Sequence, residues 1–261
     1  MKYLKSEIHI SDRKNTIKIA MATFAMSVAA IFGSVDNASA KQTARTTAAS
    51  ISTDINYLLY TPEYYEMSED NFPLVVWLHG GDQGGSDVSK VRESGLPSMI
   101  EQGKQFPFLI FSPQNPSDEL LYPIERIKSA LDEIVSSEKV DPSRIYLMGY
   151  SRGGFGAWAM AEQFPETFAA VVPIAGGGTR HYLNRTNENA AFWAFHGTND
   201  EVIPLSDTVI MVQRLQQLNR NVHLSVLEGV NHEGVEAAAL GNSELWEWLA
   251  KQQLRPVEVE K

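Results

Sequence analysis

Residues 145–153 read Ile145-Tyr146-Leu147-Met148-Gly149-Tyr150-Ser151-Arg152-Gly153, which is an apolar run followed by the pattern G-x-S-x-G. In this pattern a buried strand turns sharply into a helix, and the strained turn exposes the serine hydroxyl group. Residues 152–164 supply the helix, and Pro165 ends it. A solvated serine in an ordinary strand-to-helix turn is the alternative, but the strand before and the helix after favour Ser151 as a nucleophile.

Strand-like and helix-like segments alternate around this stretch. Six further segments have the character of strands: residues 57–60, 74–78, 108–111, 169–174, 191–195 and 222–227. Three further segments repeat apolar residues at helical spacing: residues 123–138, 205–218 and 243–251. The alternation predicts an α/β fold, in which helices cover both faces of a mostly parallel sheet and form three layers with it.

The first forty residues differ in character from the rest of the chain. Lys14 and Lys18 precede an apolar run over residues 19–33, and Ala38-Ser39-Ala40 follows. A basic start, an apolar middle and a small-residue cleavage site are typical of a secretory signal peptide. An uncleaved membrane anchor is the alternative, although the run is shorter than the roughly 20 residues that a membrane span needs.

We therefore predict a signal peptide over residues 1–40, a flexible lead-in over residues 41–53 and a single domain over residues 54–261. The signal peptide implies export to a periplasm or to the outside of the cell, with no stable membrane anchor after cleavage. A mature chain of this length suits one domain with a single core.

The composition excludes several kinds of partner and site. The chain has 22 basic and 32 acidic residues and a net charge of −10, which disfavours nucleic acid and anionic membranes as partners. It has no cysteine, so disulfides, thiolate chemistry and cysteine-ligated metals are excluded. No set of histidines has the spacing of a metal site. We therefore predict neither a metal nor a cofactor.

Polar or glycine-rich segments follow the predicted strands. They are residues 79–85, 149–153, 176–178, 196–200 and 229–234. Because the carboxyl ends of parallel strands lie at one edge of a sheet, where ligands usually bind, these segments should form one surface. We expect the reactive groups to come from this surface.

Asp200, just past the predicted strand 191–195, is the candidate acid. A carboxylate at this place can fix the tautomer of a catalytic histidine and stabilise its charged form. Asp207 and Glu201 are the alternatives. Asp207 lies in the first turn of a helix, where the helix dipole alone favours an acid, and Glu201 should point away from Asp200.

His232 is the candidate base, in a predicted loop between the last strand and the last helix. The order Ser151, Asp200, His232 along the chain is the order found in α/β-hydrolases. The other histidines have weaker claims. His79 and His196 sit at strand ends and are expected to orient loops, His181 in a polar loop could contact a substrate, His223 begins a strand, and His9 is in the leader.

Two backbone N–H groups are candidates for an oxyanion hole. One belongs to Arg152, the residue after the nucleophile. The other comes from the glycine-rich loop after strand 74–78, where Gly81 is the first choice and Asp82 the second. A loop that only turns the chain is the alternative for this segment.

Several motifs of the chain resemble the branch of the α/β-hydrolases that contains predicted peptidases, feruloyl esterases and polyhydroxybutyrate depolymerases. They are Leu78-His79-Gly80-Gly81, Asp141-Pro142-Ser143-Arg144-Ile145-Tyr146, Gly149-Tyr150-Ser151-Arg152-Gly153-Gly154, Phe164-Pro165-Glu166-Thr167-Phe168-Ala169-Ala170, and Phe195-His196-Gly197 with Asp200, Val202 and Pro204. The resemblance covers residues 54–250. It implies an α/β-hydrolase fold, a triad of Ser151, Asp200 and His232, and oxyanion donors at Gly81 and Arg152.

Two departures from the family pattern concern the substrate. The residue after the nucleophile is often apolar in such enzymes, and here it is Arg152, whose side chain either reaches an acidic group of the substrate or pairs with a surface carboxylate. Residues 113–122 lack the tryptophan expected near the acyl pocket and offer Leu120, Leu121 and Tyr122 instead. This argues against specificity for an aromatic acyl group. The candidate substrate contacts are Asp82, Tyr122, Arg152 and His181.

The resemblance implies an exported serine esterase that acts on a small-molecule or polymer-linked ester. A serine peptidase of the prolyl-oligopeptidase type is an alternative, although the chain carries no propeller domain. A non-catalytic binding protein on a hydrolase fold is another, because fold alone does not determine function. The complete set of triad residues speaks against that reading.

Overall fold

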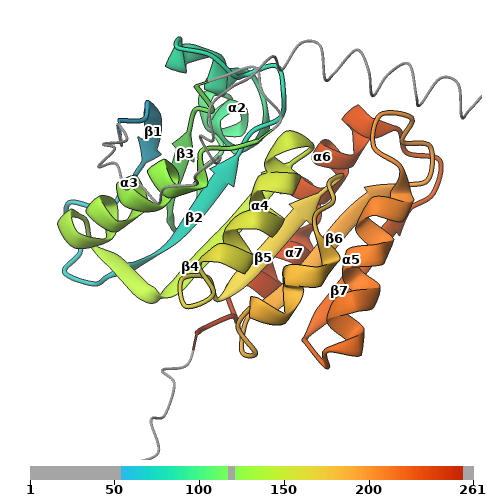
Figure 1. Cartoon of the computed structure of the whole chain (residues 1–261). Helices are drawn as coiled ribbons and strands as arrows, with labels where there is room; N and C mark the ends of the chain where they lie inside the picture. Colours follow the sequence, from blue (N-terminus) through green and yellow to red (C-terminus); the bar gives the residue numbers. More distant parts are fainter. Residues whose placement is uncertain (1–53, 117–120, 255–261) are drawn as a thin grey trace, which may run out of the picture. The chain divides into compact units, whose positions relative to one another are not determined.

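The computed structural model describes residues 54–116 and 121–254 (Figure 1). The predicted signal peptide over residues 1–40 and the lead-in over residues 41–53 lie outside the described residues. Seven strands form one sheet with the order β1-β3-β2-β4-β5-β6-β7. Their bounds are β1 (Tyr57–Tyr60), β2 (Phe72–Leu78), β3 (Leu109–Pro113), β4 (Val140–Tyr150), β5 (Ala170–Ile174), β6 (Ala191–Gly197) and β7 (Val222–Leu227).

The sheet is parallel except at one edge. β1 runs antiparallel to β3, and every other pair of neighbouring strands is parallel. Residues 74–78 of β2 are fully buried, as expected of a strand in a parallel sheet that is covered on both faces. This explains the continuous apolar runs in the sequence.

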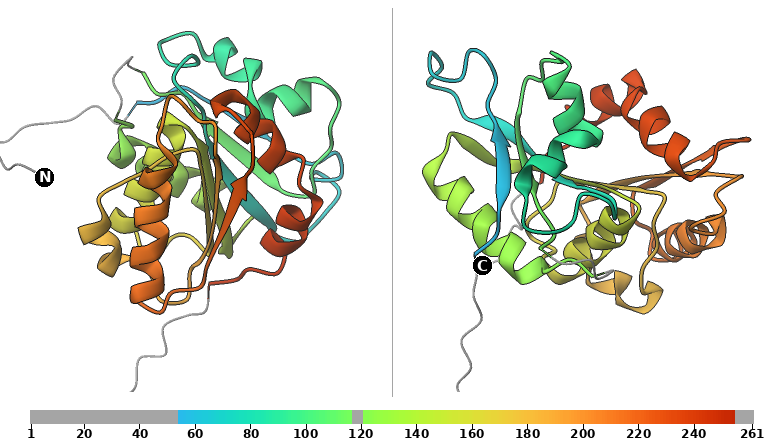
Figure 2. Two further views of the ribbon diagram at one scale, coloured as in Figure 1. Left: turned by 90° about the vertical axis from the view of Figure 1, so that its right-hand side faces the viewer. Right: turned by 90° about the horizontal axis from the view of Figure 1, so that it is seen from above.

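Helices cover both faces of the sheet (Figures 1 and 2). One face carries α3 (Ile124–Ser137), α4 (Arg152–Gln163) and α5 (Leu205–Gln217), and the other carries α2 (Gly95–Glu101), α6 (His232–Leu240) and α7 (Ser243–Leu249). Two 3₁₀ helices, η1 (Val88–Glu93) and η2 (Arg180–Arg185), lie in connections. The three layers and the mostly parallel sheet confirm the predicted α/β fold.

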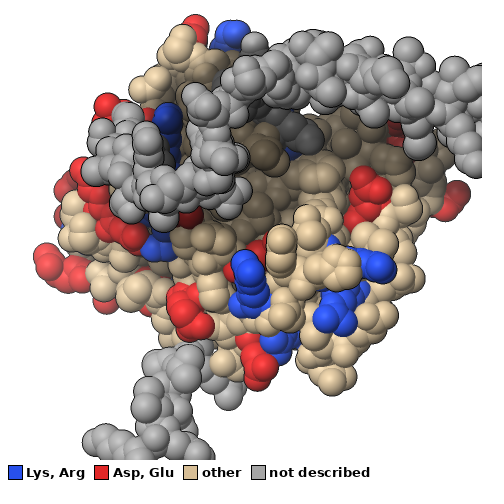
Figure 3. Space-filling view, viewed as in Figure 1, with Lys and Arg blue, Asp and Glu red and all other residues tan. Residues whose placement is uncertain are grey.

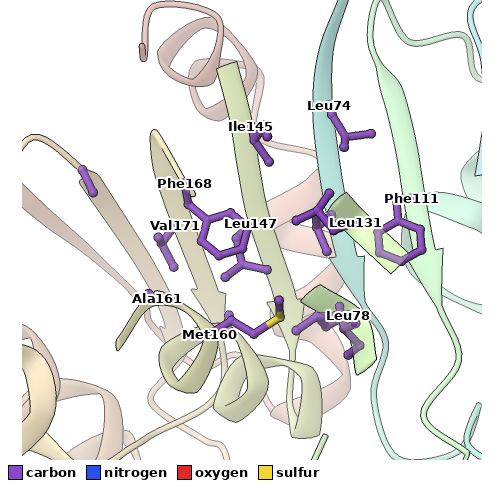
Figure 4. Packing of buried hydrophobic residues seen from close by; sticks show 14 of the residues in the cluster. Leu74, Leu78, Phe111, Leu131, Ile145, Leu147, Met160, Ala161, Phe168 and Val171 are labelled. Carbon is purple, nitrogen blue, oxygen red and sulfur yellow. The ribbon is translucent and has the colours of Figure 1, made fainter. Parts of the chain in front are cut away.

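An apolar cluster fixes α4 on the sheet (Figure 4). Met160 of α4 lies over Leu147 and Leu78 of the sheet. Further along the same face, Trp158 stacks on Phe192 with ring centroids 5.8 Å apart. These contacts hold the helix whose N-terminus follows Ser151.

β4 begins at Val140, earlier than the predicted residue 145. Val140 pairs with Phe72, and the register of β2 and β4 shifts between Phe72 and Leu74. Such an irregularity accommodates extra residues in one strand. The segment around Pro142 is therefore part of the strand.

Four short helices were not predicted: η1, α2, η2 and α6. Each has at most nine residues, and so short an element shows little apolar periodicity. The most consequential is α6, because the prediction of a loop at His232 is wrong. His232 is the first residue of α6, and the N-cap side chain of Asn231 accepts a hydrogen bond from the backbone N–H of Gly234 at 3.1 Å.

The surface seen in Figure 3 carries both signs of charge. On the coloured part of this face, acidic and basic side chains are interspersed, without a continuous basic band. Among the described residues, no helix has both the length and the apolar character needed to cross a membrane.

Candidate active site

Ser151 occupies the turn between β4 and α4. Its φ is 54°, in the left-handed region that side chains other than glycine rarely adopt. The backbone N–H of Ser151 donates to the carbonyl of Ile174 on β5 at 2.8 Å, and its own carbonyl accepts from Phe155 N at 3.1 Å. The turn is therefore held by backbone hydrogen bonds on both sides in a conformation that carries strain.

The two glycines of the motif are required by close approach of the backbone. A Cβ atom on Gly149 would lie 2.1 Å from the carbonyl oxygen of Gly153. One on Gly153 would lie 1.9 Å from the carbonyl oxygen of Leu78 on β2. Both distances are far below contact, so the turn can cross β2 only with glycine at these positions.

The structure brings Ser151, His232 and Asp200 together. His232 Nε2 lies 2.8 Å from Ser151 Oγ, and His232 Nδ1 lies 2.7 Å from Asp200 Oδ2. Because a carboxylate only accepts, the hydrogen-bond network assigns the proton to Nδ1 and leaves Nε2 free to accept from the serine hydroxyl. The arrangement can therefore remove a proton from Ser151.

Asp200 is held by its own loop. Its Oδ1 atom accepts from the backbone N–H groups of Val202 at 3.0 Å and Ile203 at 2.8 Å. Asp200 and His232 are buried, and Ser151 is half-buried. The acid is therefore fixed away from water, while the serine hydroxyl stays accessible.

Backbone contacts join the loop that carries Asp200 to the loop that precedes His232. The N–H of Thr198 donates to Leu227 O at 3.0 Å, and the N–H of Asn199 donates to Val230 O at 3.1 Å. A Cβ atom on Gly197 would lie 2.1 Å from Val230 O. The loop that carries the acid and the loop that leads into the base therefore pack as one unit.

Tyr150 also contacts this site, and its role was not anticipated. Its hydroxyl group donates to the backbone carbonyl of His232 at 3.1 Å, and its ring packs against the imidazole with centroids 5.1 Å apart. Burial, reinforced by the charge of Glu236, raises the pKa of Tyr150 far above its usual range, so the phenol stays a donor. Its position directly before the nucleophile was the only signal in the sequence.

The side chain of Arg152 lies next to Gly81. A Cβ atom on Gly81 would lie 3.3 Å from Nη2 of Arg152, so the arginine side chain packs against this glycine. Arg152 is the first residue of α4, and Gly81 belongs to the loop after β2. The N–H groups at a helix N-terminus point away from the helix toward a developing charge. The roles of Gly81 and Arg152 as donors stay predictions, and so does the partner of the Arg152 guanidinium.

His79 supports the loop that carries Gly81. Its Nδ1 donates to Gly80 O at 2.6 Å, and its Nε2 accepts from the backbone N–H of Asn115 at 3.0 Å. Burial, with a smaller contribution from the Arg152 guanidinium, lowers the pKa of His79 to about 4. The ring is therefore neutral and serves as both donor and acceptor.

The predicted substrate contacts fall in different places. Tyr122 is buried, and its hydroxyl group donates to His79 O at 2.7 Å, so it braces the loop after β2. Asp82 is exposed in that loop. His181 is exposed on η2 and lines a depression of about 310 Å³ beside α5, which none of the triad residues lines. The structure therefore does not bring His181 to Ser151, and contact of Tyr122 or Asp82 with a substrate stays a prediction.

In the part of the chain that the structure describes, no group of three or more histidine and carboxylate side chains is arranged to hold a metal ion.

A buried carboxyl group lies one helical turn beyond His232. Glu236 is on α6, and the backbone N–H of Gly95 donates to its carboxylate. Its Oε1 atom is buried without a hydrogen-bond partner among the described residues. Burial raises the pKa of Glu236 from 4.5 to about 7.

This pKa predicts a pH-dependent cost to stability. Between pH 4.5 and 7 the folded protein retains a proton that the unfolded chain releases, so the free energy of unfolding falls as the pH rises through this window. Replacing Glu236 with glutamine removes the ionisation. We therefore expect Glu236→Gln to gain stability relative to the wild type as the pH rises, by roughly 2–3 kcal/mol at neutral pH and above.

Urea unfolding of both proteins across this pH range measures the difference. Glu162, whose pKa burial also raises to about 7, is present in both and cancels. Glu247→Gln, on an exposed site of α7, is the matched control for the loss of one carboxylate. A stability difference between Glu236→Gln and the wild type that stays constant with pH would contradict the prediction.

Comparison with known proteins bears on the fold and the family. Residues 115–239 match the Dienelactone hydrolase family. Over 138 residues the chain is 32% identical to poly(3-hydroxyalkanoate) depolymerase C of Paucimonas lemoignei, and the match covers 47% of this chain and 31% of that protein. The chain spans about a third of the length of the curated relatives that it matches.

Solved structures share the same architecture. A crystal structure of a thermostable esterase has a TM-score of 0.65 and 26% sequence identity, covering 76% of this chain and 59% of that one. An acylaminoacyl peptidase of Pyrococcus horikoshii has a TM-score of 0.59 and 15% identity, covering 79% and 41%, and this likeness concerns the fold alone. The chain therefore belongs to the α/β-hydrolase superfamily, as its motifs had indicated.

Proposed function

We propose that the protein is a serine hydrolase that cleaves carboxylic esters through an acyl-enzyme. The observation that carries the proposal is the continuous hydrogen-bonded chain from Ser151 Oγ through His232 to Asp200, with distances of 2.8 and 2.7 Å. Similarity to an esterase and to a poly(3-hydroxyalkanoate) depolymerase supports ester hydrolysis.

The first half of the reaction forms the acyl-enzyme. Ser151 Oγ attacks the ester carbonyl carbon while His232 Nε2 takes the hydroxyl proton, and Asp200 stabilises the resulting imidazolium. The carbonyl oxygen becomes an oxyanion held by the backbone N–H groups of Gly81 and Arg152. The carbon–oxygen bond to the alcohol then breaks, and the alcohol leaves with the proton from His232.

The second half releases the acid. Water attacks the acyl carbon and transfers a proton to His232, the bond to Ser151 breaks, and Ser151 Oγ regains its proton from His232. Each proton that His232 accepts is returned, so the site needs no other reactant. The substrate supplies the acyl group and water supplies the hydroxyl group of the acid.

The substrate class is an ester of a small molecule or of a polymer. The name of the depolymerase relative favours an aliphatic ester, and the absence of a tryptophan from residues 113–122 is consistent with this choice. A peptidase is the second candidate, favoured by the shared fold of the acylaminoacyl peptidase. We rank it lower because the relatives with sequence identity above a quarter include an esterase and an ester depolymerase.

Two assays test the proposal. A fluorophosphonate probe should label the wild type and leave Ser151→Ala unlabelled, since the probe reacts only with an activated serine. Nitrophenyl esters of increasing acyl length, each with its amide counterpart, separate esterase from peptidase, and we expect the esters to be cleaved far faster. Amides cleaved as fast as their esters would overturn the first choice, and absence of labelling in the wild type would favour a binding protein.

A further inference from the structure

Asp200 contacts a second histidine besides His232. His196, at the end of β6, is completely buried, and its Nε2 atom lies 3.3 Å from Asp200 Oδ2. The same oxygen atom lies 2.7 Å from His232 Nδ1. The backbone N–H groups of Val202 and Ile203 occupy the other carboxylate oxygen. Two imidazole rings therefore lie beside Oδ2.

Three groups hold the ring of His196. Ile203 O lies 2.9 Å from Nε2, and because a carbonyl can only accept, Nε2 carries a proton and donates to it. On the other side of the ring, Thr208 Oγ1 lies 2.7 Å from Nδ1 and 2.6 Å from Gly176 O. The ring therefore joins the loop that carries Asp200 to α5 and to the segment after β5.

We propose that His196 is a positioning residue, which holds Asp200 in the orientation that His232 requires. The inference rests on the proposed function, because it assigns His196 a part in that reaction. The torsion that turns a carboxylate about its last bond is broad, with no sharp staggered minima. His196 restricts this rotation in two ways. Its ring lies beside Oδ2, and its hydrogen bond to Ile203 O holds the residue whose backbone N–H donates to Oδ1.

The orientation of Asp200 matters because it sets the state of the base. Asp200 keeps the proton of neutral His232 on Nδ1, which leaves Nε2 able to accept from Ser151. If Asp200 rotates away, His232 can take the other tautomer or turn its ring, and proton transfer from Ser151 fails. Loss of His196 should therefore slow the chemical steps and leave substrate binding nearly unchanged.

A purely structural role for His196 predicts a different outcome. In that case the ring only satisfies Ile203 O and Thr208 in the core. A variant would then lose stability, but each folded molecule would turn over at the normal rate. The turnover per active site distinguishes the two roles.

Two polar variants of His196 distinguish the positioning role from the purely structural role. The side chain of His196→Gln reaches the place of Nε2 and can still donate to Ile203 O, beside Asp200. The side chain of His196→Asn reaches only the place of Nδ1, beside Thr208, and puts no donor near Asp200. We expect His196→Asn to lower kcat by about 10- to 100-fold, as when an outer hydrogen-bond partner of a functional ligand is removed.

The substrate is the nitrophenyl ester that the wild type cleaves fastest in the panel described above. Titration with the fluorophosphonate probe gives the concentration of active sites. We expect the KM of His196→Asn to stay within roughly 3-fold of the wild-type KM. The kcat of His196→Gln should stay within roughly 5-fold of the wild-type kcat. Each of these changes is smaller than the change that the loss of one hydrogen bond can cause. A kcat of folded His196→Asn equal to that of the wild type overturns the inference. So does an equal loss of kcat in both variants. Absence of turnover in the wild type instead refutes the proposed function.

A double-mutant cycle with Asp200→Asn provides a second measurement, which also serves if His196→Asn folds poorly. If His196 acts through Asp200, adding His196→Gln or His196→Asn to Asp200→Asn should change kcat by less than about 2-fold. Losses that multiply would show that His196 acts independently of Asp200, and would overturn the inference.

Discussion

Replacing Ser151 with alanine is expected to lower kcat for the favoured ester by roughly 10⁴- to 10⁶-fold. The hydroxyl group of Ser151 lies 2.8 Å from His232 Nε2 and forms the bond to the acyl group in the proposed reaction. Without it no acyl-enzyme forms, and only the slower attack of water assisted by the remaining groups is left. Stability should change little, because alanine has the same backbone strain at this position and only one side-chain hydrogen bond is lost.

Assays with the nitrophenyl ester measure the loss of kcat, and urea unfolding verifies that the variant is folded. Ser206→Ala, an exposed serine at the start of α5, is the matched control and should keep wild-type turnover. A folded Ser151→Ala variant that retains a tenth or more of the wild-type kcat would show that the nucleophile is elsewhere.

Replacing Gly153 with alanine is expected to destabilise the protein by about 4 kcal/mol or more, or to prevent folding. The added methyl group would lie 1.9 Å from the carbonyl oxygen of Leu78 and 2.8 Å from that of His79. Both atoms belong to the backbone, so no side-chain rotation relieves the overlap. Either α4 moves away from β2 or the end of β2 is displaced, and each movement disrupts the core beneath α4.

Gly103→Ala is the matched control for this substitution. Gly103 has a φ of 90°, and a Cβ atom there would meet nothing within 4 Å. Its replacement should therefore cost only backbone strain, roughly 1–2 kcal/mol. Urea unfolding compares the two variants, and similar losses of stability in both would contradict the steric explanation for Gly153.

The strands and the reactive groups could be predicted from the sequence because both leave strong local patterns. Buried parallel strands such as residues 74–78 are continuous apolar runs, and the turn at Ser151 is marked by two glycines. Asp200 and His232 were identified by their order and by their places after strands. A shared edge of the sheet then implied that they lie together, and the structure places them within hydrogen-bond distance.

Features that depend on contacts between distant segments could not be predicted in the same way. His196 and Asp200 are only four residues apart in the sequence. Their contact nevertheless depends on the path of the loop through Ile203 and on the position of Thr208 in α5. The bond from Tyr150 to the carbonyl of His232 joins residues that are 82 positions apart. The helix at His232 was missed because its nine residues have almost no apolar periodicity.

The close approach of Gly153 to the carbonyl of Leu78 has a consequence for how this protein can change over evolutionary time. At this contact the location of the nucleophile depends on one stretch of main chain resting on another, rather than on the side chains that surround the serine hydroxyl group. Mutations that reshape the surroundings of the serine can therefore accumulate without displacing it. Such a scaffold can acquire new substrates by substitution of neighbouring residues, while the two glycines themselves can hardly vary.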